Sequence, residues 1–564
     1  MIQKIRPVQF AIVIFLVLLA SCHRAGKKPG TNIARSPRAV QPLLPDLIRD
    51  WLNYIQAHEG KIDDSSALSQ AAITKKIYEQ VEFAPAWSKQ GNWNEMGDSI
   101  LLFIEHAKLF GLFPEDYHGR ELKQIRTLFY NDSSGKGERK DAGIWSKADV
   151  LITDAFVQAV KDLKLGRLQN DSITLRKDSV LTDEFYLQKF NELQKNGGWS
   201  ILVRSLEPSH PGYRQLKAAI PRFLDSIDGR VFTKVPSREK DPKNFKPALQ
   251  KRLFEGGFLA TDSVAADSVT LAAAIKKFQI KKGITADGRV GEMTIRMLNT
   301  SDKDRFIRIA LSMDKYKMLP ETMPARYIWV NLPGYYLVVR EGDSIRLTSK
   351  IVCGRPMNNT PQLTSAISEM ITYPKWTVPA SIILKEILPA QKRNSGYLTK
   401  KGFSLVDRKG NEVDPLSVDW SKYNKGIPYS VVQGSGDANA LGVFKFNFSN
   451  NYSVYLHDTN QRYLFGLPSR ALSHGCVRVQ EWQPLARYIL RNDSPSGESE
   501  ASRARQDSMS NWLAHKQKHS IPVRNRLPLF IRYYTCEGKN GNIVFYDDIY
   551  GEDRLLAQRY FAGK

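Results

Sequence analysis

The chain has 564 residues, which is too long for one compact core and predicts several domains. A composition of 42% hydrophobic and 25% charged residues is ordinary for a globular protein. The formal net charge of +24 is compatible with nucleic acid, an anionic membrane or an anionic polymer such as a cell wall. Because the Lys and Arg residues are spread along the chain, a solvated basic surface explains the net charge equally well. The charge therefore does not identify a partner.

The N-terminus has the order of an export signal. Two basic residues precede the apolar run AIVIFLVLLAS, which stops at Cys22 and is too short for a transmembrane helix. Leu19-Ala20-Ser21-Cys22 resembles the lipobox of bacterial lipoproteins, in which the cysteine is acylated. The alternative is a plain signal or membrane anchor that ends in cysteine. We expect an exported, periplasmic lipoprotein anchored to a membrane of a bacterial envelope, with a flexible tether after Cys22.

The first half of the chain is predicted to be helical. LLFIEHAKLFGL (101–112) and DVLITDAFVQAVKDLKLG (149–166) repeat apolar residues at spacings of three and four, and each ends near a glycine. This region carries no convincing chemical motif. We therefore expect a helical scaffold.

A smaller unit follows, and it is predicted to contain three helices. Its second helix has an apolar stripe from Leu271 to Phe278, and a glycine-punctuated turn leads into the third. The run AIKKFQIKKGITADGRVGEMTIRMLN resembles the three-helix peptidoglycan-binding domain of wall enzymes. The matching residues are Phe278, Gln279, Gly283, Asp287, Gly288, Gly291 and Thr294. The same residues also suit a small core and its turns.

From about Ala325 the spacing of apolar residues changes from the helical pattern to the alternation typical of strands. YIWVNL, YYLVVRE and SIRLTSKIVCG are separated by turn residues, as in an antiparallel meander. Further strands are predicted in GVFKFNF (442–448), NYSVYLHDT (451–459), LPLFIRYYTCE and NIVFYDD, the last two joined at Asn540-Gly541. The low-complexity stretch 492–508 is predicted to be a surface loop.

Together these patterns predict a multidomain α+β protein. We expect a signal peptide over residues 1–21, a lipidated tether over 22–45, a helical scaffold domain over 46–240, a peptidoglycan-binding-like domain over 241–300, a linking helix over 301–324, and a mainly antiparallel β catalytic domain over 325–550. The polar segment 386–436 looks like an insertion on the β domain that covers something, so we expect it to be a cap.

The candidate for chemistry is Cys476, in ALSHGCVRVQ (471–480). If NYSVYLHDT is a strand, Ser453, Tyr455 and His457 share one face, and in CVRVQ Cys476 and Arg478 share one. If the two strands are neighbours, imidazole and thiol meet on a polar face while the valines fill the core. A histidine beside a thiol can accept its proton, which nucleophilic activation requires.

The glycine before the thiol fits the same interpretation. Without a Cβ, Gly475 lets Ser473-His474-Gly475-Cys476 turn tightly and aim N–H groups at one point. Such a cluster can hold the oxyanion of a tetrahedral intermediate. Arg478 can hold a loop or attract a substrate carboxylate.

Other readings of this thiol stay open on residue chemistry alone. A zinc site from His457, His474 and Cys476 lacks a clear fourth ligand and a usual spacing. A papain-like protease would place its cysteine before its histidine, the reverse of the order here. A structural thiol remains possible, but it would not explain both the adjacent glycine and the histidine on the matching face. Cys353 and Cys536 are expected to be small buried hydrophobes. Because three exported thiols is an odd number, at least one stays free or pairs with another chain.

His457 followed by Ser473-His474-Gly475-Cys476-Val477-Arg478 resembles the signature of the L,D-transpeptidases, with a YkuD-type catalytic domain. The likeness extends to VCGRPMNNTP, ITYPKWTVP, ILPAQKRNSGYL, LGVFKFNF and YLHDTN, and so spans most of residues 305–550. The order of domains resembles the large subgroup that has a scaffold domain and a capping insertion.

The resemblance implies a peptidoglycan cross-linking reaction. Cys476 would attack the carbonyl of the third residue of a tetrapeptide stem, and His457 would take the thiol proton and later protonate the leaving D-alanine. A backbone carbonyl near Asp458 would orient the histidine, and the backbone at His474 and Gly475 would contact the oxyanion. The candidates for substrate binding are Arg478, Tyr455, Asp458, Ser473 and Trp376. A neighbouring stem's amine would resolve the thioester and give a 3–3 cross-link.

The resemblance implies no metal or organic cofactor, no nucleic acid partner, and inactivation by carbapenems at the same thiol. Some relatives carry serine where this chain has His474, so the role of base is assigned to His457. The alternatives are an L,D-carboxypeptidase, in which water resolves the thioester, and a wall-binding lipoprotein with a dead catalytic domain. The intact Cys476, His457 and Gly475 count against the last.

Overall fold

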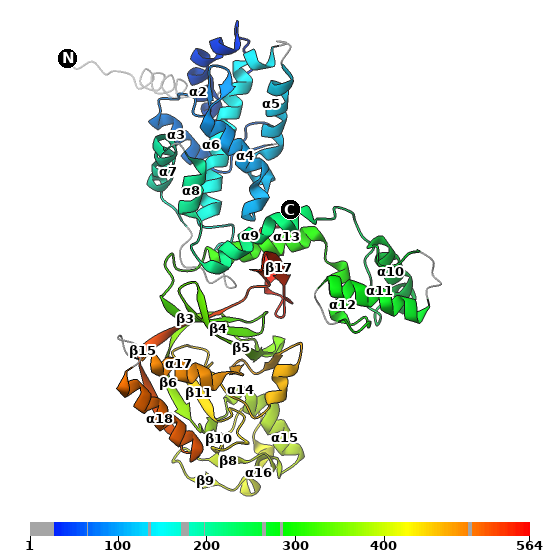
Figure 1. Cartoon of the computed structure of the whole chain (residues 1–564), viewed down its shortest axis with the longest axis vertical. Coiled ribbons are helices and arrows are strands. Elements are labelled where there is room, and N and C mark those ends of the chain that lie inside the picture. Colours follow the sequence, from blue (N-terminus) through cyan, green and yellow to red (C-terminus); the bar gives the residue numbers. More distant parts are fainter. Residues whose placement is uncertain are drawn as a thin grey trace, which may run out of the picture. The chain divides into compact units, whose positions relative to one another are not determined.

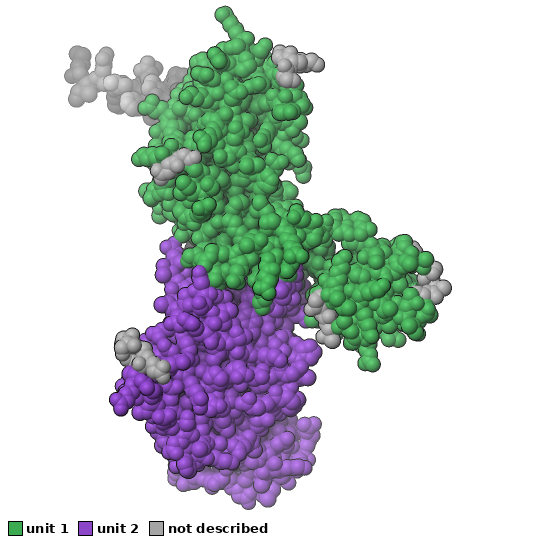
Figure 2. Space-filling model, in the orientation of Figure 1, with its two compact units in different colours: residues 1–319, 538–543, 556–564 green, residues 320–537, 544–555 purple. Residues whose placement is uncertain are grey.

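The computed structural model describes residues 28–564 except 65, 133–136, 171–179, 197, 262–266, 283–285 and 494–498. The predicted signal peptide and Cys22 lie outside the described residues. The chain divides into two compact units, coloured separately in Figure 2: residues 1–319, 538–543 and 556–564, and residues 320–537 and 544–555. Within the described ranges no helix is both long enough and apolar enough to cross a membrane.

The first unit is built around one buried helix, α6 (Ala142–Lys164). Its residues are apolar on nearly every side, which is the pattern of a helix enclosed by others. The helices that pack against it are α2 (Leu44–Ala57), α3 (Ala71–Gln80), α4 (Glu95–Glu105), α5 (Gly119–Asn131), α7 (Asp183–Asn196) and α8 (Trp199–Leu206). The prediction of a helical N-terminal part is confirmed (Figure 1).

Buried acidic residues of α6 accept hydrogen bonds from the segments packed around this helix. Asp149 accepts hydrogen bonds from the Tyr78 hydroxyl at 2.7 Å and from the Ala86 N–H at 2.8 Å. Burial raises the pKa of Asp149 to about 6, although these hydrogen bonds oppose the shift. These contacts are structural, because each carboxylate oxygen is occupied by the surrounding backbone or a hydroxyl.

Three short helices make the predicted small unit: α10 (Pro242–Glu255), α11 (Ser268–Lys281) and α12 (Glu292–Asn299). Leu253, Ile275, Phe278 and Leu298 fill its core. Gln279, on α11, donates to Asp287 at 2.9 Å and accepts from the Gly288 N–H at 2.9 Å. The motif residues Gln279, Asp287 and Gly288 therefore hold the turn before α12. Two further helices of the first unit, α9 (Pro211–Asp225) and α13 (Asp302–Tyr316), pack on each other.

The second unit contains a nine-stranded sheet with the order β13-β5-β14-β12-β11-β6-β15-β3-β4. Its strands are β3 (Arg326–Asn331), β4 (Tyr336–Glu341), β5 (Ser344–Gly354), β6 (Leu363–Thr372), β11 (Phe444–Phe448), β12 (Leu456–His457), β13 (Ala471–Ser473), β14 (Val477–Val479) and β15 (His519–Arg532). Because β5 also pairs with β4, the sheet closes on itself. Three pairs are parallel, β12–β14, β13–β5 and β15–β3, and the rest are antiparallel. The predicted α+β class with a mainly antiparallel β domain is confirmed.

Two helices cover this sheet, α17 (Trp482–Arg491) and α18 (Glu500–Ala514). The predicted surface loop over 492–508 is wrong from residue 500 onward, where α18 begins after a capping box at Ser499. The sequence did not predict this helix because the segment is mostly polar: only Met509 and a few neighbours pack on the core of the sheet. A hairpin of β16 (Cys536–Lys539) and β17 (Asn542–Phe545) turns at Asn540-Gly541 as predicted, and both turn residues have positive φ.

The cap is a folded part of its own, here defined as residues 376–433. It contains β7 (Trp376–Thr377), α14 (Ala380–Ile382), the π-helical turn η7 (Ile383–Ile387), α15 (Leu388–Arg393), α16 (Tyr397–Lys400), β8 (Phe403–Val406), β9 (Glu412–Val413) and β10 (Ser430–Gln433). Its four-stranded sheet has the order β7-β10-β8-β9, and its core is separate from that of the large sheet. The predicted insertion over 386–436 overlaps it. Since β7 pairs with β10, the two ends of the cap lie side by side.

Candidate active site

Sheet register places the candidate histidine and cysteine on one face. β12 and β14 are parallel neighbours in which His457 pairs with Arg478. Leu456 and Val477 point into the core and are fully buried. Cys476 directly precedes β14, two residues before Arg478, and so lies diagonally across from His457. Strand spacing and rise put their Cα atoms about 8 Å apart, which the two side chains can bridge.

The strand that carries His457 is shorter than predicted. It begins at Leu456, not at residue 451, because Ser453 adopts a left-handed backbone with φ of 56°. The predicted place of Ser453 on the strand face is therefore wrong. Its carbonyl instead lies 3.9 Å from the Cys476 Sγ, so the bend before β12 contacts the thiol.

Tyr455, directly before β12, lies beside Cys476. The Val477 N–H donates to the Tyr455 carbonyl at 3.1 Å, which places Tyr455 beside Cys476. Burial raises the pKa of the Cys476 thiol, while the backbone N–H and phenol of Tyr455 act in the opposite direction. Burial and the thiol also raise the pKa of the Tyr455 phenol, and the side chain of Trp376, on β7 of the cap, opposes that shift.

His457 is neutral around pH 7. Its side chain is buried, and this burial, followed by the Arg478 charge, lowers its pKa to about 3. The backbone carbonyls of Asp458 and Leu441 face it and act in the opposite direction. Its Nδ1 is buried without a hydrogen-bond partner among the described residues. A neutral imidazole with a free ring nitrogen can serve as a general base towards a protonated thiol.

The loop before Cys476 is stabilised by hydrogen bonds to buried hydroxyl groups. Gly475 has φ of +124°, a conformation that favours glycine. Its carbonyl accepts from the Thr360 hydroxyl at 2.7 Å, and its N–H donates to the Ser473 Oγ at 3.2 Å. The same buried Ser473 hydroxyl donates to the Cys476 carbonyl at 2.6 Å. Ser473 therefore braces the loop, and these contacts favour that role over direct contact with substrate.

His474 turns towards the cap. Its Nε2 lies 2.6 Å from Oε1 of Glu386, on η7, and the Arg355 guanidinium binds the same oxygen at 2.5 Å. Burial would raise the pKa of Glu386, but the bonds and charges of His474 and Arg355 outweigh it and leave the pKa lowered. We call these three residues the cap cluster. Sequence reasoning missed Arg355 and Glu386, because nothing local links positions so far apart in the chain.

Arg478 and Asp458 both hold the segment that follows β12. The Arg478 Nη1 donates to Thr459 at 3.2 Å and to Gln461 at 2.8 Å, while its Nε is buried without a partner in the described part of the chain. The Asp458 carboxylate accepts from the Val443 N–H at 3.0 Å and is paired with a neighbouring arginine. Over the residues described, no group of three His, Cys, Asp or Glu side chains is arranged to hold a metal ion.

Sequence reasoning also missed Lys445. It lies on β11 directly opposite His457, and its ammonium rests 4.0 Å from the centroid of the Tyr455 ring. Burial lowers its pKa, while Cys476 and Glu369 act in the opposite direction. The alternation in GVFKFNF could have indicated it: the three phenylalanines share the buried side of the strand, and the lysine lies on the opposite, polar side.

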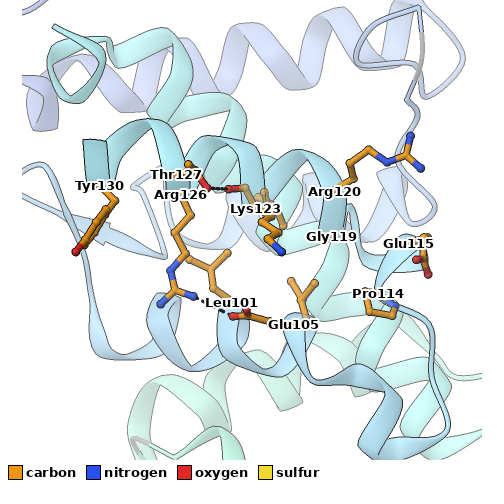
Figure 3. A pocket seen from close by; sticks show the side chains of 12 residues that line it. Leu101, Glu105, Pro114, Glu115, Gly119, Arg120, Lys123, Arg126, Thr127 and Tyr130 are labelled. Carbon is orange, nitrogen blue, oxygen red and sulfur yellow. Dashed lines mark hydrogen bonds and ion pairs between the residues drawn. The ribbon is translucent and has the colours of Figure 1, made fainter. Parts of the chain in front are cut away.

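A separate hollow of about 520 Å³ lies in the first unit between α4 and α5 (Figure 3). Arg126 pairs there with Glu105 at 3.4 Å, and the Thr127 hydroxyl donates to the Lys123 carbonyl at 2.8 Å. The residues that line it include no cysteine, histidine or serine. It therefore offers no thiol or imidazole, and the cysteine chemistry is assigned to the surroundings of Cys476.

Two family models match the chain. Residues 325–494 match one described as the L,D-transpeptidase catalytic domain, YkuD, and residues 72–220 match one described as a scaffold domain. A provisionally named L,D-transpeptidase of Haemophilus influenzae strain Rd is 38% identical over 250 residues, which are 44% of this chain and 48% of that protein. The alignment thus spans about half the length of this relative.

A solved structure also matches part of the chain. It is titled a crystal structure of L,D-transpeptidase (Yku) from Stackebrandtia nassauensis. The match covers 46% of this chain and 90% of that one at 17% identity. Its TM-score of 0.16 is too low to bear on the fold.

Proposed function

We propose that this chain, whose residues 325–494 match the L,D-transpeptidase catalytic domain YkuD, forms 3–3 cross-links in peptidoglycan. The observation that supports this most strongly is that Cys476 directly precedes β14, the strand that pairs with β12 at His457, and follows a loop turned at Gly475. Thiol, base and a tightly turned backbone are the three parts that acyl transfer needs.

The first half of the reaction would acylate the enzyme. His457 takes the thiol proton as the Cys476 Sγ attacks the carbonyl of the third residue in a tetrapeptide stem. The tetrahedral intermediate collapses when His457 returns this proton to the amine of the terminal D-alanine and the C–N bond breaks. D-Alanine leaves, and the tripeptide stem remains as a thioester on Cys476.

The second half would transfer the stem. The side-chain amine of a neighbouring stem attacks the thioester and loses a proton to His457. The C–S bond then breaks, and the departing sulfur takes that proton back. Thioesters favour attack by amines over attack by water, which suits transfer in a wet compartment. If water is the acceptor instead, the same residues give an L,D-carboxypeptidase.

The oxyanion of both intermediates would be held by backbone N–H groups around His474 and Gly475. Thr360 and Ser473 fix the loop, so these groups would need little rearrangement during the reaction. The Gly475 N–H already donates to Ser473 at 3.2 Å, so an oxyanion at this position would compete with that hydroxyl.

The remaining parts of the proposal concern location and partners. Acylation of Cys22 would anchor the exported chain to a membrane on the periplasmic side, and the three-helix unit over 241–300 would bind peptidoglycan. Carbapenems would inactivate the enzyme by acylating Cys476. The family resemblance and the N-terminal sequence support these points.

The test is incubation of the protein with disaccharide-tetrapeptide, followed by mass spectrometry of the products. We expect a cross-linked tetrapeptide–tripeptide dimer and free D-alanine. Cys476→Ala should reduce both to background, because it removes the thiol that would carry the thioester. Cys353→Ala is the matched control: it removes a fully buried thiol of the same sheet and should leave cross-linking intact. Tripeptide without dimer would identify a hydrolase, and no product would contradict the proposal.

A further inference from the structure

Three neighbouring strands carry a row of basic side chains across the active face. On β11 and β12, Lys445 is paired with His457, and on β12 and β14, His457 is paired with Arg478. Residues that are directly opposite in a sheet point to the same side. The imidazole therefore lies between an ammonium and a guanidinium, and Cys476 lies in the adjacent row.

The two cations differ in what they bind. The Arg478 guanidinium is engaged by Thr459 and Gln461. The Lys445 ammonium rests on the face of Tyr455, and no carboxylate among the described residues forms an ion pair with it. Glu369, whose charge acts on Lys445, is itself bonded to Asn447 at 2.6 Å and to Ser520.

A half-buried ammonium without a counter-ion is costly in a folded protein unless a ligand supplies the negative charge. The Tyr455 ring compensates in part, because cations are attracted to its face. The ring also fixes where the ammonium lies, next to the thiol. Lys445 thus has the properties of a residue that receives a carboxylate from a bound molecule.

The order of residues across the strands indicates which carboxylate this is. Cys476, beside β14, attacks the carbonyl, and His457, on β12, must protonate the amine of the leaving group. The leaving group therefore extends from β14 towards β11, where Lys445 stands. In a tetrapeptide donor that group is the terminal residue, whose carboxylate lies one carbon beyond its amine.

We propose that the Lys445 ammonium binds the terminal carboxylate of the donor stem and makes the enzyme specific for donors with a free C-terminus. This inference rests on the proposed function and deepens it, because it assigns the part of the donor that Lys445 recognises. Lys445 would be a substrate-binding residue that acts on the leaving-group side, opposite Arg478.

The test compares two donors, disaccharide-tetrapeptide with a free carboxylate and the same molecule with a C-terminal amide. The unmodified protein should prefer the acid by roughly tenfold or more in kcat/KM, as expected for a hydrogen bond between charged groups. Lys445→Met should lower kcat/KM for the acid far more than for the amide, so that the preference disappears. Lys445→Arg should retain part of it. Lys350→Met, at an exposed lysine on β5, is the matched control and should keep the full preference.

Each outcome decides the matter. Loss of the acid preference in Lys445→Met, with an unchanged unfolding temperature, would support the inference. Equal losses for acid and amide would overturn it and assign Lys445 to the thiol or the histidine. An unmodified protein that uses both donors equally would overturn it as well. If neither donor gives a Cys476-dependent product, the proposed function fails, and this inference fails with it.

Discussion

At the scale of single residues, the protonation states of Cys476 and His457 decide how the thiol is activated. Burial raises the pKa of the thiol and lowers that of the imidazole, so both groups are uncharged near pH 7. A preformed thiolate–imidazolium pair would need the opposite shifts. In the proposed reaction the proton would therefore move when substrate is attacked, and Tyr455 is the residue that most directly favours the thiolate.

We expect the rate of alkylation of Cys476 by iodoacetamide to rise with pH through the neutral range without a plateau below pH 9. The reason is that a raised thiol pKa keeps the thiolate fraction small until alkaline pH. Tyr455→Phe should slow alkylation further at pH 8, by roughly several-fold, because it removes a phenol that lowers the thiol pKa. Mass spectrometry of the peptide containing residue 476 measures the rate. Tyr452→Phe, at an exposed tyrosine, is the control. A plateau at acidic pH would show that an ion pair already exists.

At the scale of elements, the cap cluster connects η7 to the loop that carries the thiol. Glu386 binds both His474 and Arg355, and the Arg355 N–H donates to the Ser473 carbonyl at 2.9 Å. All three side chains are about one-third exposed or more, so their contribution to stability is small. Their effect is expected on the position of the loop more than on folding.

Glu386→Gln keeps the shape of the side chain but removes its charge. We expect kcat for cross-linking to fall by roughly three- to tenfold, with a small change in KM, because a loop that is held less firmly presents the oxyanion donors less well. Steady-state kinetics with disaccharide-tetrapeptide measures both constants. Lys385→Gln changes an exposed neighbour on the same turn and should have no effect. A Glu386→Gln enzyme with normal kcat would contradict a role of the cap cluster in catalysis.

At the scale of the whole molecule, the β-rich unit contains two separate cores. The large sheet has one core and the cap has another, and the cap leaves and re-enters at the paired residues Thr377 and Val432. A deletion inside the cap, such as 395–420, would remove Leu398 and Leu405 from the cap core and expose the rest. Removal of the whole cap tests its role more cleanly.

We expect a variant in which Asn-Gly replaces residues 378–431 to keep the large sheet folded. A two-residue turn fits because Thr377 and Val432 are Cα partners in an antiparallel pair. Cross-linking should fall by roughly tenfold or more in kcat/KM, since the cap cluster that connects η7 to the loop before Cys476 is lost. Circular dichroism and thermal unfolding report on the fold, and muropeptide analysis reports on activity. Unchanged kcat/KM would show that the cap does not contribute to catalysis.

The amino-acid sequence by itself determined the fold class and most strands of the β-rich unit, and it supplied the proposal that the chemistry lies at Cys476. Alternation of apolar residues depends on local periodicity, so Val477 and Val479 were placed in the core correctly, and Gly475 marked a turn that only glycine adopts easily. The same periodicity failed at Ser453, where the backbone turns left-handed before the strand begins.

Only the tertiary structure decided which residues surround the thiol. Lys445, Glu386 and Arg355 come from segments far from Cys476 in sequence, and pairing of β11 with β12 or contact between cap and loop brings them near. Local patterns carry no information on such long-range pairings. The burial of His457 and Cys476 also depends on long-range packing. The pKa of each group is shifted mainly because segments distant in sequence exclude water around it.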